Sequence, residues 1–158
     1  MNSILFLGVA IVIVCATVQC ALIAFLRRRA RRWRDNRAAA HGFMNETLHL
    51  SVIVAALFLG MCAQVGIWAL VYVLNGDLPD FQTAIYFSMS SFTTLGYGDV
   101  VLSGRNAILG PMEACNGILM AGLATGFLFS TFQAGFEKRE ADETARRHEH
   151  AHPPRRIR

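Results

Sequence analysis

Apolar residues form three long segments that polar or irregular sequence separates. The first covers residues 4–26, the second residues 46–74 and the third residues 108–136. A helix rises about 1.5 Å per residue, so about 20 apolar residues cross the hydrocarbon core of a bilayer. Each segment is long enough for this, and the pattern predicts three transmembrane helices.

A shorter segment, Phe81–Phe92, lies between the second and third segments. As a helix it would be only about 18 Å long, too short to span a membrane. The turn-rich sequence Asn75–Asp80 precedes it, and a glycine-rich stretch follows it. Irregular backbone at membrane depth is tolerated only where protein buries it or water lines it. The pattern therefore predicts a re-entrant helix followed by a loop held within the protein.

Composition agrees with a membrane location. Hydrophobic residues make up 54% of the 158 residues, and the mean hydropathy is +0.39. Both values are high for a soluble domain, and few ionisable residues interrupt the apolar segments. The expected fold class is an all-α membrane protein of the multi-pass type. No Ser/His/Asp, HExxH, Walker-type or Rossmann pattern appears in the sequence, so we expect neither an enzyme nor a cofactor.

A basic cluster follows the first apolar segment, with seven arginines in residues 27–37. Under the positive-inside rule this end faces the cytoplasm, which places the N-terminus outside and the C-terminus in the cytoplasm. Arginine at every third position (Arg28, Arg31, Arg34) also suggests a voltage sensor, but further arginines occupy the gaps where such a helix needs apolar residues. We interpret the cluster as a topology anchor that contacts anionic lipids, and not as a nucleic-acid footprint.

The most specific chemistry lies in Thr93–Val100, with the sequence TTLGYGDV. Glycines on both sides of a tyrosine suit a backbone that turns its carbonyls inward, because glycine adopts φ > 0 without Cβ strain. A preceding threonine can add its hydroxyl as a further oxygen ligand. Four such strands around an axis would form rings of carbonyl oxygens that replace the hydration shell of K⁺.

The hexapeptide Thr94–Asp99 closely resembles the selectivity filter of potassium channels, with leucine where valine is commonest. The resemblance extends over residues 46–136 as outer helix, pore helix, filter and inner helix. It implies a homotetramer around a central pore, with K⁺ as the transported ion. The implied ion ligands are the Thr94 hydroxyl and four backbone carbonyls, those of Thr94, Leu95, Gly96 and Tyr97. The residues implied in filter support and in the outer mouth are Thr93, Gly98, Asp99, Tyr86 and Phe87.

Two departures from the family pattern affect these expectations. Tyr86 and Phe87 replace a tryptophan pair that is common in the pore helix. Phenylalanine cannot donate a hydrogen bond to the filter tyrosine, so we expect a less stiffly held filter. The stretch after Asp99 also lacks a common proline and is short, which leaves Gly117 and Gly122 as alternative gating hinges.

Glu113 and Asn116 are polar residues inside the third apolar segment, three positions apart and therefore on one side of a helix. Such residues usually face a bundle interior or water. One interpretation is a structural hydrogen bond behind the filter, to Arg105 or the pore helix. The other is a polar ring that concentrates cations in the pore.

We therefore expect a domain division in the order N-terminal transmembrane helix, basic cytoplasmic linker, channel-like pore domain and cytoplasmic tail, at residues 1–26, 27–45, 46–136 and 137–158. Asn45 is the expected N-cap of the second transmembrane helix. The expected function is passive, potassium-selective transport without a voltage sensor. The alternatives are a weakly selective cation channel and a non-conducting membrane assembly or modulatory subunit.

Overall fold

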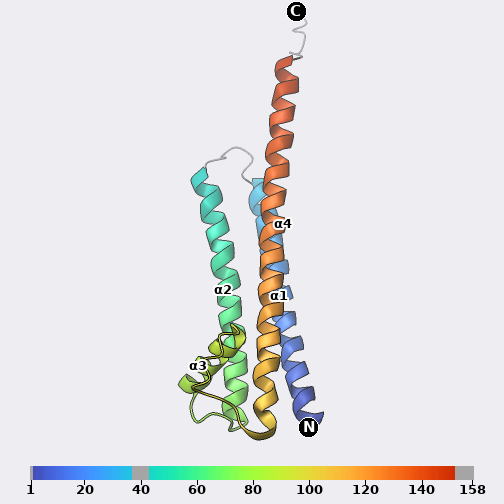
Figure 1. The fold of residues 1–158 in the computed structure, drawn as a ribbon. Coiled ribbons are helices and arrows are strands. Elements are labelled where there is room, and N and C mark those ends of the chain that lie inside the picture. The colour runs from blue at the N-terminus through green and yellow to red at the C-terminus, as the bar shows by residue number, and fades with distance from the viewer. Residues whose placement is uncertain (1, 37–42, 152–158) are drawn as a thin grey trace, which may run out of the picture. The chain divides into compact units, whose positions relative to one another are not determined.

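A computed structural model describes residues 2–36 and 43–151 (Figure 1). These residues form, in order, α1 (Asn2–Asn36), α2 (Phe43–Leu74), α3 (Phe81–Phe92), the 3₁₀ helix η1 (Gly104–Ile108) and α4 (Leu109–Ala151). No strand occurs in these two ranges, and the prediction of an all-α protein is confirmed.

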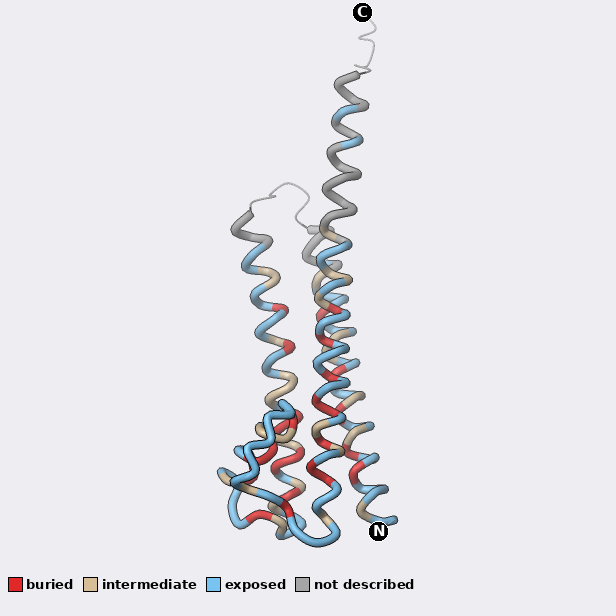
Figure 2. Tube along the Cα trace, in the orientation of Figure 1, coloured by how far each residue is buried: buried red, intermediate tan, exposed pale blue. Residues whose placement is uncertain are grey.

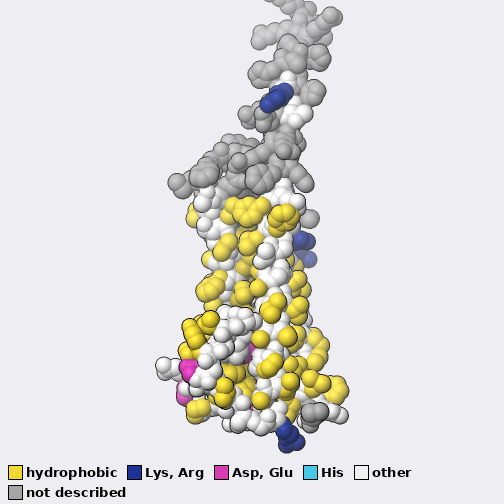
Figure 3. All heavy atoms as spheres, in the orientation of Figure 1, with side chains coloured by type: hydrophobic (Ala, Val, Ile, Leu, Met, Phe, Trp, Pro, Cys, Tyr) yellow, Lys and Arg dark blue, Asp and Glu magenta, His cyan; other side chains and the backbone are white. Residues whose placement is uncertain are grey.

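Three helical stretches are long and apolar enough to cross a membrane, namely Asn2–Ala30, Thr47–Leu74 and Gly104–Gln133. They correspond to the three predicted spans. Large apolar side chains on them point outward, and Figure 3 shows such side chains spread over the visible face of the helices. Lipid chains can cover this surface in a bilayer. The short helix α3 has the predicted bounds, Phe81–Phe92.

Three helix ends differ from the expected bounds, and one of them is the end of α4, which continues past residue 136 to Ala151. Helix α1 continues beyond Leu26 through the basic cluster to Asn36, because arginine ends the apolar stretch but is itself a good helix former. Helix α2 begins at Phe43, so the prediction of an N-cap at Asn45 is wrong. Residues 37–42 of the expected linker, and 152–158 of the expected tail, lie outside the described residues.

The chain divides into two compact units, Met1–Ala124 and Thr125–Arg158. The first contains α1, α2, α3, η1 and the beginning of α4. The second contains the remainder of α4, which is helical to Ala151. Every candidate site residue lies in the first unit, and the following description concerns that unit.

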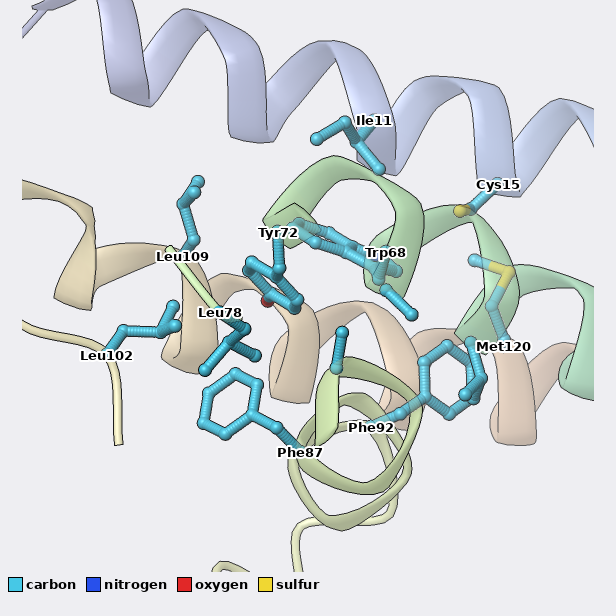
Figure 4. Packing of buried hydrophobic residues seen from close by; sticks show 13 residues of the cluster. Ile11, Cys15, Trp68, Tyr72, Leu78, Phe87, Phe92, Leu102, Leu109 and Met120 are labelled. Atoms are coloured by element: carbon cyan, nitrogen blue, oxygen red, sulfur yellow. The ribbon is translucent and has the colours of Figure 1, made fainter. Parts of the chain in front are cut away.

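The core of the first unit forms where α3 packs against the longer helices. Buried positions concentrate around α3 in Figure 2. Figure 4 shows Tyr72 of α2 near Leu78 and Phe87, and Phe92 of α3 near Met120, all within one cluster of buried residues. Trp68 and Tyr72 are fully buried. This packing fixes the short helix between larger elements and thereby determines where the following loop begins.

Helix α1 packs against both α2 and the start of α4. The helices approach closely at Gly8, where an added Cβ would lie 2.6 Å from the end of the Met112 side chain, which would have to shift. Further along α1, the buried Gln19 side chain accepts a hydrogen bond from the Gln64 amide at 2.9 Å. Hydrogen bonds of this kind join helices in an apolar surrounding.

Candidate functional site

An aspartate defines the start of α3. Asp80 has an extended backbone, and its carboxylate accepts hydrogen bonds from the Thr83 amide and the Thr83 hydroxyl, both at 2.8 Å. This is the usual geometry of a helix N-cap. The hydrogen bond from the Thr83 amide is the largest cause that lowers the pKa of Asp80 from its ordinary value.

The last turn of α3 anchors the loop that follows it. The Ser90 carbonyl accepts hydrogen bonds from the amides of Leu95 at 2.9 Å and Gly96 at 3.2 Å. The Ser90 hydroxyl accepts a further bond from the Tyr97 amide at 3.3 Å, and the Thr94 amide donates to Ser91 at 2.9 Å. The amides of Thr94–Tyr97 therefore point back toward α3. Within the described residues, no hydrogen bond is accepted by the carbonyl oxygens of these four residues.

The backbone of this loop alternates in conformation. The angle φ is 61° at Thr94, 58° at Gly96 and 79° at Gly98. The two glycines adopt positive φ without strain, as the sequence predicted. Thr94 is the one described residue other than glycine with positive φ, and for a β-branched residue this is a costly conformation. Such strain persists only where the surrounding hydrogen bonds and packing enforce it.

Tyr86 contacts the C-terminal end of the loop. Its hydroxyl donates to the Asp99 carboxylate at 2.7 Å, and its ring stacks on Tyr97 with centroids 6.4 Å apart. The bond from Tyr86 lowers the pKa of Asp99 and raises that of Tyr86 itself. Phe87 is buried and packs edge-on against Tyr72, with centroids 5.2 Å apart. Of the aromatic pair, Tyr86 contacts the loop and Phe87 belongs to the core.

Glu113 lies behind the loop, fully buried between three helices. The Tyr72 hydroxyl of α2 donates to its Oε2 at 2.6 Å, and the Ser88 hydroxyl of α3 lies within hydrogen-bond distance of its Oε1. Its partners are thus Tyr72 of α2 and Ser88 of α3, the expected pore helix, and not Arg105, which was the other expected partner. Asn116 is also fully buried. The contacts of Glu113 fit the structural interpretation, because its carboxyl is buried and meets hydroxyl groups of two neighbouring helices.

The two candidate hinge glycines have different surroundings. Gly117 is buried, and a Cβ there would lie 1.8 Å from the carbonyl oxygen of Phe92, at the end of α3. Gly122 has open space around it. Close packing of α4 against the end of α3 is therefore enough to explain the glycine at position 117. No contact within the first unit explains the glycine at position 122. Both lie within the continuous helix α4.

Asp80, Tyr72, Ser88 and Ser90 are among the residues in these contacts that were not foreseen as site residues. Asp80 could have been found, because an aspartate directly before an apolar run is a typical N-cap signal. Tyr72, Ser88 and Ser90 gave no such signal, since each lies in an apolar helix and meets its partner only in the folded chain.

The model of an ion-channel family matches residues 50–134, which include most of α2, all of α3, the loop and much of α4. Comparisons with curated proteins and with solved structures gave no match.

Proposed function

This chain belongs to the ion-channel family, and from that premise we propose that it is a potassium-selective channel that conducts K⁺ passively. The loop Thr94–Tyr97 is the proposed filter. Its ligands would be the four backbone carbonyls, with the Thr94 hydroxyl as an additional oxygen. The basic cluster is not a voltage sensor under this proposal, because the further arginines Arg29 and Arg32 occupy gaps where such a helix needs apolar residues.

The observation that carries the proposal is the alternation of positive φ at Thr94, Gly96 and Gly98. In an ordinary strand, successive residues have similar dihedral angles and their carbonyls alternate in direction. Left-handed conformations at every second residue allow successive carbonyls to turn toward the same side. The amides of this stretch donate toward α3, which leaves the carbonyls available to a dehydrated cation.

A single filter strand cannot surround an ion, so the proposal requires a homotetramer. The exposure of Leu95 and Tyr97 supports assembly, since these apolar side chains are 56% and 66% exposed in one chain. Burial of such surface favours association. The C-terminal end of α3 precedes the filter directly, and its partial negative charge favours a cation near the membrane centre.

We further propose that the N-terminus is outside and the C-terminus cytoplasmic. The beginning of α1 packs at Gly8 against Met112, and α1 also contacts η1, which follows the filter in the chain. The start of α1 thus lies at the same end of the first unit as the outer mouth. The exposed residues Arg28 and Arg29 would then meet anionic headgroups on the cytoplasmic side.

The test is electrical recording from the purified chain in planar bilayers. A tetramer in mild detergent together with a K⁺-selective current is the expected result. A current that does not distinguish K⁺ from Na⁺ would make the chain a weakly selective cation channel. A tetramer that never conducts, in lipid compositions with and without anionic lipid, would favour a modulatory subunit.

A further inference from the structure

Glu113 forms a junction of hydrogen bonds between three helices. Its two oxygens meet Tyr72 of α2 and Ser88 of α3, and the Ser88 hydroxyl is also 2.9 Å from the carbonyl oxygen of Val65 in α2. Glu113, Tyr72 and Ser88 are each fully buried. The protons available to these groups decide which of the bonds can exist at the same time.

The serine hydroxyl has only one proton to donate. It lies within hydrogen-bond distance of two acceptors, the Val65 carbonyl and Glu113 Oε1. An ionised carboxylate only accepts, so with ionised Glu113 one of these two contacts would have no proton. A protonated carboxyl resolves the conflict. Oε1 then donates to Ser88, Ser88 donates to Val65, and Tyr72 donates to Oε2.

The surroundings of Glu113 also disfavour a charge. The groups that interact with its carboxyl are the hydroxyls of Ser88 and Tyr72, and no cation pairs with it among the described residues. The titratable groups that face it are Tyr72 from α2 and the Cys15 thiol from α1, and Asp77 acts on Tyr72 from the following turn. None of these supplies a positive charge. An unpaired carboxylate in a buried apolar site is strongly unfavourable.

We propose that Glu113 is a neutral carboxylic acid at neutral pH, and that its proton completes the hydrogen bonds that join α3 to α2 and α4. Ser88 is half a turn before Ser90, whose carbonyl and hydroxyl hold the filter amides. Glu113 is therefore a positioning residue that acts on the filter through α3. The protonation stands independently of ion conduction, whereas its effect on the filter rests on the proposed function.

Infrared spectroscopy of the full chain in lipid at neutral pH tests the protonation directly. A difference spectrum between wild type and Glu113→Gln should contain the carbonyl band of a protonated carboxylic acid. The bands of an ionised carboxylate in that spectrum, with no acid band, would overturn the proposal. The measurement needs no current, so it remains decisive if the chain proves not to conduct.

Two substitutions test the positioning role. Glu113→Gln keeps the length of the side chain and one donor toward Ser88, but it cannot ionise. Glu113→Asp keeps the acid but is one methylene too short to reach both Ser88 and Tyr72. We expect the glutamine variant to keep the wild-type unfolding temperature and K⁺ over Na⁺ preference, and the aspartate variant to lose both in part. The reverse order, with aspartate tolerated and glutamine damaging, would show that the charge is needed and would contradict the proposal.

Discussion

Gly117 lies where α4 approaches the end of α3 most closely, and its replacement by alanine tests that approach. A Cβ at Gly117 would lie 1.8 Å from the carbonyl oxygen of Phe92 and 2.8 Å from the carbonyl carbon. Both atoms belong to the backbone and cannot rotate aside as the end of a long side chain can. Relief requires a shift of about 1 Å or more in the segment that leads directly into the filter.

The size of the effect follows from two opposing contributions. Overpacking a well-packed site lowers the free energy of unfolding by about 1–3 kcal/mol and occasionally more. Alanine in place of glycine inside a helix raises it by about 1 kcal/mol. Because the overlap at Gly117 involves backbone atoms, we expect a net loss of about 2 kcal/mol in the free energy of unfolding per chain. The matched control is Gly122→Ala, where a Cβ meets nothing within 4 Å. There only the helix gain of about 0.5–1 kcal/mol remains.

Thermal unfolding of the purified variants, followed by circular dichroism in detergent, measures this difference. Gly117→Ala should unfold below the wild-type temperature, and Gly122→Ala at or above it. Equal unfolding temperatures for the two variants would refute the close contact between α4 and α3. Single-channel recording of Gly122→Ala adds the hinge test, since reduced opening at undiminished stability would identify Gly122 as the hinge.

Three further predictions concern α3 and the filter. Gly96→Ala should abolish K⁺ flux or its preference over Na⁺, because alanine at positive φ costs about 1–2 kcal/mol per strand. Thr94→Ala should mainly weaken ion binding at the inner site. Flux assays with K⁺ and Na⁺ compare the two variants. Tyr86→Phe should raise the pKa of Asp99 toward its ordinary value in a carboxyl NMR titration, and an unmoved titration would contradict the bond. The sign follows from the lowered pKa: the stabilising bond is present at neutral pH and is lost as the pH falls through the pKa of the folded state. Asp80→Ala should lower the unfolding temperature while Asp80→Asn, which keeps a capping oxygen, should not, and equal losses would contradict the N-cap.

The lengths of the apolar segments were enough to predict the membrane-spanning helices. The bounds of α3 follow from a stretch of 12 residues between the turn before Phe81 and the glycine-rich loop after Phe92. The same reasoning failed where hydrophobicity and helix propensity diverge. Arg27 ends the apolar stretch but not the helix, which continues to Asn36.

The sequence could not predict the contacts that hold the filter. Positive φ was expected at the glycines but not at Thr94, because β-branched residues disfavour that conformation and only the fold imposes it. Tyr72 and Ser88 are separated from Glu113 by 41 and 25 positions, and no periodicity links residues so far apart. The sequence indicated that a buried acid would need a partner, and the packing of α3 determined which one.

The most direct test of the central claim is the reversal potential of the purified chain in a planar bilayer with K⁺ on one side and Na⁺ on the other. We predict a reversal potential displaced strongly in the direction that K⁺ selectivity requires, and loss of that displacement or of the current in Gly96→Ala. A reversal potential near zero in the wild type, or an unchanged one in Gly96→Ala with the current intact, would contradict a filter built from the carbonyls of Thr94–Tyr97.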